Sequence, residues 1–91
     1  MKLEDALFNW LQIDRVASAR PDDRAALQTR DFFLTVLQED HGVSCVSVSA
    51  EDATMVHVRV EFEKGSRKLF MFDRQASEQL LADIASNPRY Q

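Results

Sequence analysis

The spacing of apolar residues changes twice along this chain, and these changes divide it into helices, strands and a final helix. Up to Gly42, apolar side chains recur at three- and four-residue steps, the period of an amphipathic helix. From Val43 to Phe72 they largely alternate with polar ones, the period of a strand with one buried face. Beyond Asp73 the helical spacing returns. We therefore predict a single α+β domain over residues 1–91 with the element order α-α-β-β-β-α.

The N-terminal half is predicted to form two antiparallel helices. The first covers residues 3–19, with Trp10 on its apolar face. Pro21 suits the first position of the second helix, because an N–H there would have no partner within the helix. This helix is expected to reach about residue 40, since Gly42 can take the left-handed conformation that commonly ends a helix. So short a connection predicts an αα-hairpin.

The C-terminal half is predicted to form a three-stranded antiparallel meander followed by one helix. The strands are expected at residues 43–50, 54–63 and 67–73. Asp73 can cap the last helix by accepting a hydrogen bond from a first-turn N–H group. Asn87 and Pro88 end that helix, and "RYQ" is expected to be a frayed tail.

The alternation also predicts how the first two strands pair. A register that pairs valine with valine gives both strands a common apolar face. The expected pairs are Val46 with Val58, Val48 with Val56, Ser47 with His57, and Cys45 with Arg59. The last two pairs would lie on the opposite, polar face of the sheet.

The third strand, "RKLFMFD", has large apolar side chains on both of its faces. Leu69 and Met71 alternate with Phe70 and Phe72. A two-residue loop at residues 64–65 would put the phenylalanines on the outer face and pair Glu61 with Lys68. A three-residue loop would exchange the two apolar sets. With either loop, one of these two pairs of apolar side chains lies outside the main core and must be covered by another element or by a partner.

The side chains on the predicted outer face form the candidate protein-interaction surface. They are Cys45, His57, Arg59, Lys68, Phe70 and Phe72. Two arrangements could place apolar residues there. In the first, the helices cover both sheet faces and make a three-layer domain. In the second, all helices share one face, and the other binds a partner.

Charge and apolar patterning argue against nucleic acid and membranes as partners. Acidic residues exceed basic ones, giving a net charge of −4, and the basic residues are scattered rather than gathered in a patch. No stretch approaches the length of a transmembrane segment, and the N-terminus lacks an export signal. The single cysteine, Cys45, cannot form an internal disulfide. We therefore expect a soluble, cytoplasmic protein.

No arrangement of reactive side chains in the sequence predicts catalysis. Ser47 and His57 would be neighbours across two strands, but no glycine-rich elbow or orienting acid accompanies them. A metal site could recruit Cys45, His57, His41 and Asp40, whose spacing matches no structural zinc pattern. Only two glycines are present, which excludes phosphate-binding glycine loops. We expect no enzyme activity, no metal and no cofactor.

The last two thirds of the chain resemble the double-stranded RNA-binding domain in their element order, α-β-β-β-α. That family uses lysines at the start of its last helix to contact phosphates. The corresponding segment here, "RQASEQLLADIA", has Arg74 as its only basic residue and contains Glu78 and Asp83. The segment "SAEDATM" also lacks the histidine and glycine pattern of the family. The resemblance therefore implies a topology and no RNA-binding residues.

Three functional hypotheses follow from the sequence. The first is an interaction module, expected to be a homodimer joined through the outer face or free edge of the third strand. The second is an acidic regulator that competes with nucleic acid for a basic protein. Its negative surface would comprise Glu39, Asp40, Glu51, Asp52, Glu61 and Glu63. The third is a small enzyme that uses His57, in a pocket also lined by Asp73.

Overall fold

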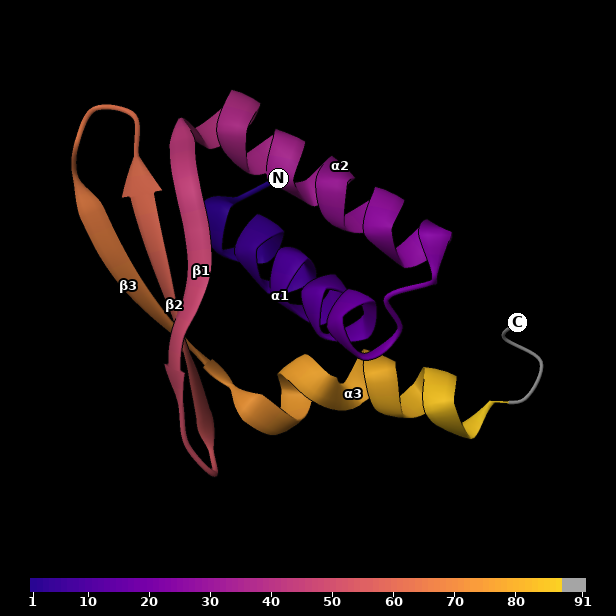
Figure 1. Cartoon of the computed structure of the whole chain (residues 1–91). Helices are drawn as coiled ribbons and strands as arrows, with labels where there is room; N and C mark the ends of the chain where they lie inside the picture. Colours follow the sequence, from indigo (N-terminus) through magenta and orange to yellow (C-terminus); the bar gives the residue numbers. More distant parts are fainter. Residues whose placement is uncertain (88–91) are drawn as a thin grey trace.

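A computed structural model describes residues 1–87 and confirms the predicted order α-α-β-β-β-α (Figure 1). The elements are α1 (Leu3–Ala19), α2 (Arg24–His41), β1 (Val43–Glu51), β2 (Met55–Phe62), β3 (Arg67–Asp73) and α3 (Arg74–Ser86). Gly42 has φ 65° and ends α2 in the left-handed conformation, as predicted. The side chain of Asp73 accepts a hydrogen bond from Ala76 N at 2.8 Å and caps α3. The predicted frayed tail lies outside the described residues.

The start of α2 differs from the prediction that Pro21 opens the helix. The helix begins at Arg24, and residues 21–22 form a turn between the two helices. Asp23 is the N-cap, and its side chain accepts a hydrogen bond from Ala26 N at 3.0 Å. A carboxylate cap satisfies a helical N–H that a proline at the first position cannot. The acid, rather than the proline, therefore sets the helix start.

The predicted register between β1 and β2 is wrong by two residues. Val46 lies opposite Val60 and Val48 opposite Val58, so the valines still share one face. Irregularities between Val43 and Cys45 and between Val48 and Ala50 shift the pairing along the strand. Ser47 consequently lies opposite Arg59, and Cys45 opposite Glu61.

Of the two loop lengths considered for the β2–β3 hairpin, the structure has the three-residue one, so the pairing expected with a two-residue loop is wrong. The N–H of Phe62 donates to the carbonyl of Ser66, which leaves residues 63–65 as the loop. Gly65 has φ 98°, the left-handed position that such a loop requires. Phe70 lies opposite Val58 and Phe72 opposite Val56, on the apolar face. The two phenylalanines therefore point inward, and Leu69 and Met71 point outward.

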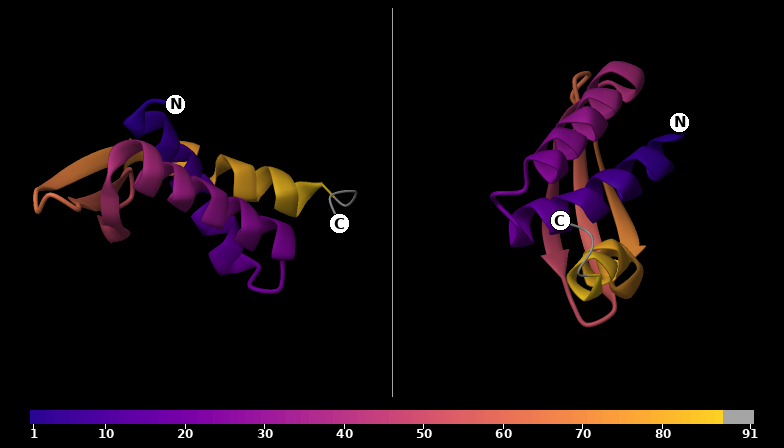
Figure 2. Two further views of the ribbon diagram at one scale, coloured as in Figure 1. Left: turned by 90° about the horizontal axis from the view of Figure 1, so that it is seen from above. Right: turned by 90° about the vertical axis from the view of Figure 1, so that its right-hand side faces the viewer.

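The domain has two layers, with all three helices on one side of the sheet (Figures 1 and 2). Strand order is β1-β2-β3, and α1 lies between α2 and α3 and packs against both. One core cluster joins α1 and α2 to the sheet, and the three valines of β2 are fully buried in it. The buried members of this cluster are Ala6, Leu7, Trp10, Leu11, Leu37, Val43, Val56, Val58 and Val60. A second cluster joins the helices, with Ile13, Val16, Ala17, Ala26 and Ile84.

Two arginines fasten the β1–β2 turn to the helices. Arg15 of α1 forms an ion pair with Glu51 at the end of β1. Arg74 lies 3.8 Å from the same carboxylate, and it also donates to the carbonyl of Asp52 at 3.0 Å. Within the turn, the Asp52 side chain accepts hydrogen bonds from the backbone N–H groups of Thr54 and Met55. These hydrogen bonds lower the pKa of the Asp52 carboxyl below its usual 3.8. The turn is thereby held against α1 and α3.

Candidate functional site

The outer face of the sheet is the side opposite the helices, and no helix of residues 1–87 covers it (Figure 2). The strand registers place eleven residues on this outer face: Cys45, Ser47, Ala50, Met55, His57, Arg59, Glu61, Arg67, Leu69, Met71 and Asp73. Its central strand carries both charge signs, as in Arg59 and Glu61, and has Met55 at its start. The two strongly exposed large apolar residues lie on β3. An antiparallel sheet with one bare face is expected to show polar residues there, so an apolar strip on that face is the candidate contact surface.

Leu69 and Met71 are the most exposed large apolar residues of the sheet. Their exposed fractions are 54% and 59%. They lie two positions apart on the same face of β3, with His57 and Arg59 opposite them on β2. Phe32 on α2 is equally exposed at 59%, but its ring packs edge-on against its neighbour Phe33. Leu69 and Met71 therefore make the apolar strip of the open face.

The structure brings three of the six predicted surface residues together on the outer face. Cys45 and Arg59 are exposed there, and His57 is partly buried. Phe70, Phe72 and Lys68 lie on the opposite face, so their predicted placement beside His57 and Arg59 is wrong. The Phe72 ring packs against that of Phe8 of α1. The Lys68 amine lies 5.5 Å from the centroid of the Phe70 ring.

Leu69 and Met71 take the place that the sequence assigned to the two phenylalanines. The loop sequence contained the signal that distinguishes the two sets. "EKG" with glycine in third position is typical of a three-residue hairpin loop, which ends in a left-handed residue and a bulge. Such a loop moves every side chain of β3 to the other face relative to a two-residue loop.

The backbone of β3 also has a free edge, and two hydrogen bonds define which residues face it. Phe62 N donates to Ser66 O, and Arg74 N donates to Thr54 O, at the two ends of the β2–β3 pair. Bonded and non-bonded pairs alternate along an antiparallel ladder. Even-numbered residues of β3 therefore bond to β2. The N–H and C=O groups of Arg67, Leu69 and Met71 point away from the sheet, toward solvent.

The two edge strands differ in how regular they are. The β1 pairing is interrupted twice by register shifts, and such bulges hinder pairing with another chain. β3 pairs with β2 without interruption from Arg67 to Asp73. It also contains no proline, so nothing in its backbone hinders the addition of a further strand. β3 is consequently the more receptive edge.

The residues considered for catalysis or metal binding are not brought together. Ser47 faces Arg59 rather than His57, so the expected serine–histidine pair is not formed. His41 lies at the end of α2, with Nε2 3.0 Å from the carbonyl oxygen of Met1. Within residues 1–87, no three His, Cys, Asp or Glu side chains are grouped to hold a metal ion.

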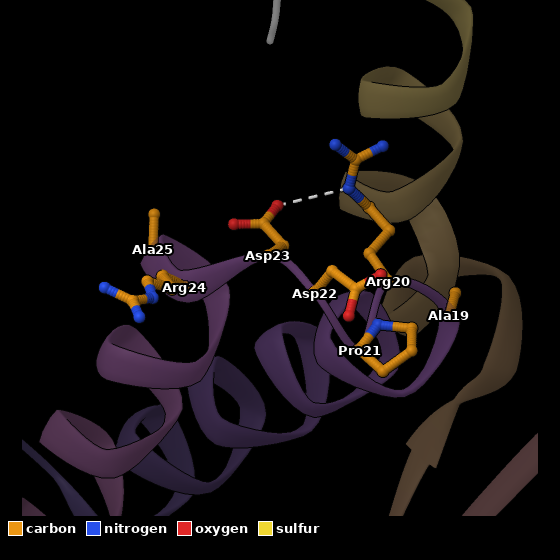
Figure 3. Close-up of a pocket in the computed structure, with 7 residues that line it drawn as sticks. All are labelled: Ala19, Arg20, Pro21, Asp22, Asp23, Arg24 and Ala25. Carbon is orange, nitrogen blue, oxygen red and sulfur yellow. Dashed lines mark hydrogen bonds and ion pairs between the residues drawn. The ribbon is translucent and has the colours of Figure 1, made fainter.

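A hollow of about 610 Å³ lies at the α1–α2 turn, lined by residues 19–25 (Figure 3). Arg20 Nε and Asp23 Oδ2 are 3.1 Å apart across it. The cap hydrogen bond from Ala26 is the main cause that lowers the pKa of Asp23 below 3.8, and Arg20 adds to it. Among the residues that the structure describes, the lining contains no histidine, cysteine or serine. Asp23 already serves as helix cap and ion-pair partner, so this hollow is best explained as part of the turn.

In comparisons with known proteins, no family model matches the chain, and no curated protein or solved structure is significantly similar to it. Within residues 1–87, none of the helices has the length and apolar character needed to cross a bilayer.

Proposed function

We propose that this chain is a small, non-catalytic interaction module that associates with a second copy of itself through β3. The exposure of Leu69 and Met71 on the open sheet face carries this proposal. A second copy would remove these side chains from water, and apolar burial is the main driving force of association. Mixed charges around the strip, as in Arg59 and Glu61, resemble the polar rim of a protein interface.

The charge distribution supports a protein partner over nucleic acid or a membrane. Four arginines are joined to acidic side chains within the fold, namely Arg15, Arg20, Arg30 and Arg74. These are four of the eleven basic residues, and the net charge of −4 further disfavours binding to phosphates. The exposed free thiol of Cys45 suits the reducing cytoplasm, which we propose as the compartment.

The acidic-regulator hypothesis has less structural support. It needs a continuous negative surface, and two of its six acids have local partners. Glu51 is bound by Arg15 and Arg74, and the Asp52 carboxylate accepts the N–H groups of its own turn. Glu61 lies between Cys45 and Arg67 on the outer face. Self-association through β3 rests on the exposed apolar side chains of Leu69 and Met71, so we place it first.

Light scattering over a concentration series tests the proposal with two matched variants. Met71→Lys and Phe32→Lys each remove an equally exposed apolar side chain and add the same charge. We expect the wild type to dimerise with rising concentration, and Met71→Lys to weaken the dimer by roughly tenfold. Phe32→Lys should associate like the wild type. A wild type that stays monomeric throughout, or equal effects of both variants, would contradict the proposal.

A further inference from the structure

We infer that β3 pairs antiparallel with β3 of a second copy, about a twofold axis that passes midway between Phe70 of one copy and Phe70 of the other. This inference rests on the proposed self-association and specifies its geometry. Two three-stranded sheets would join edge to edge into one continuous sheet. Because the twofold axis is perpendicular to the sheet, the helices of both copies would lie on the same side.

The first observation is that the outer face of β3 is self-complementary. Its residues in order are Arg67, Leu69, Met71 and Asp73, that is, basic, apolar, apolar, acidic. An antiparallel copy centred on Phe70 places Arg67 opposite Asp73 of the second copy, and Leu69 opposite Met71. Opposite charges and apolar side chains paired across strands both stabilise a sheet. A twofold axis forms each of these pairs twice.

The Asp73 carboxylate can take part without giving up its cap. Its Oδ2 accepts the hydrogen bond from Ala76 N. Within residues 1–87, no hydrogen bond or ion pair engages Oδ1. The side chain is exposed, so a guanidinium from the second copy can reach it.

The second observation is that the backbone groups match in the same register. The N–H and C=O groups that face the free edge belong to odd-numbered residues, as the hydrogen bonds at both ends of the β2–β3 ladder require. A register centred on Phe70 pairs odd-numbered residues with odd-numbered residues. Leu69 of one copy and Met71 of the other therefore form a hydrogen-bonded pair. Phe70 meets its own counterpart in a non-bonded pair, where side chains lie closest.

The third observation is that there is space on the helix side for this contact. A hollow of about 560 Å³ separates the first turn of α1 from β3, and Phe70 and Lys68 line it. The N-terminal end of α1 extends to the β3 edge of the sheet (Figure 2). The Phe70 ring of the second copy would enter this hollow, where it contacts Phe70. The same register sets Lys68 opposite Phe72 of the second copy.

The alternative for a second copy is packing of the two outer faces against each other. That arrangement would cover Cys45 of β1 and Arg59 of β2 as well as β3. Edge pairing leaves both residues outside the contact, because β2 separates β1 from the new strand. Labelling of Cys45, the single cysteine, and substitution of Arg67 or Arg59 can therefore distinguish the two geometries.

The test compares Arg67→Glu with Arg59→Glu by sedimentation equilibrium at low salt. Both arginines are exposed on the outer face, and both substitutions change the charge equally. Edge pairing predicts that Arg67→Glu weakens the dimer by roughly tenfold or more, because two attractive pairs become repulsive. Arg59→Glu should change the dissociation constant less than about twofold. An equal or larger effect of Arg59→Glu would overturn the inference.

A second readout uses the rate at which a maleimide labels Cys45 in the wild-type chain of residues 1–91. The rate should be the same below and well above the dimer dissociation constant. Protection of Cys45 in the dimer would indicate face-to-face packing, which overturns edge pairing and leaves the proposed self-association intact. A wild type that never dimerises would overturn both.

Discussion

The ring of Phe72 in β3 packs against the ring of Phe8 in α1, with centroids 5.7 Å apart and planes inclined by 43°. This contact fixes which face of β3 belongs to the core. Because side chains alternate along a strand, it also directs Leu69 and Met71 to the open side. The position of the candidate surface thus follows from one aromatic contact and from the alternation of side chains along β3.

The face assignment predicts opposite effects for neighbouring alanine substitutions in β3. Phe72→Ala should lower the free energy of unfolding by about 2–3 kcal/mol, since it removes a ring that packs on the core. Met71→Ala should change it by less than about 0.5 kcal/mol, because that side chain is exposed. Urea unfolding below the dimer dissociation constant measures both. A larger loss for Met71→Ala would mean that β3 has the reverse orientation.

The loop glycine is predicted to be required for its backbone conformation and not for space. A Cβ at Gly65 would meet no atom within 4 Å, but φ is 98°. Gly65→Ala should therefore destabilise the fold by about 1–2 kcal/mol through strain alone. The adjacent Ser66→Ala is the control and should be nearly neutral. Thermal unfolding of the two variants tests this, and equal melting temperatures would contradict it.

The Glu51 carboxylate is predicted to hold the β1–β2 turn against α1. Glu51→Gln removes its charge and weakens the ion pairs with Arg15 and Arg74, which are partly exposed. We expect a loss of about 1 kcal/mol in low salt that shrinks as salt is raised. Glu39→Gln, on the exposed end of α2, provides the control. Equal free energies of unfolding for Glu51→Gln and Glu39→Gln in low salt would contradict this role.

Acid should weaken the β1–β2 turn at Asp52. Its pKa is lowered in the folded state, first by the N–H of Thr54 and next by that of Met55. A lowered folded pKa gives stability that is fully present above the usual 3.8 and is lost as pH falls through the folded value. Asp52→Asn keeps a side-chain acceptor without the charge. The wild type should be more stable than this variant at neutral pH, and the difference should vanish in strong acid.

The elements could be predicted from the sequence because each depends on local chemistry. Alternating valines at 56, 58 and 60 define β2, and all three are fully buried. Gly42 and Asp73 end and begin helices through their own backbone preference and side chain. Pro21 was misinterpreted because the carboxylate of Asp23, two positions later, caps the helix, which begins at Arg24.

The β1–β2 register left no signal in the sequence, whereas the β2–β3 register, on which the candidate surface depends, was indicated only by the position of Gly65 in the loop. One residue more or one residue fewer in the loop before Ser66 decides whether Phe70 or Leu69 faces the core. The phenylalanine pair and the Leu69–Met71 pair are both apolar enough for either face. The bulge near Val48 shifts β1 without leaving a pattern in the sequence. The placement of all three helices on one face depends on packing between α1 and α3, which are distant in sequence.

Hydrogen exchange at individual amides of β3, measured by NMR at low and high protein concentration, tests the central claim most directly. In the monomer, the amides of Lys68, Phe70 and Phe72 should be protected by β2, and those of Leu69 and Met71 should exchange rapidly. At concentrations above the dimer dissociation constant, Leu69 and Met71 should become protected as well. Rapid exchange at Leu69 and Met71 at every concentration would contradict the claim that this edge binds a second copy.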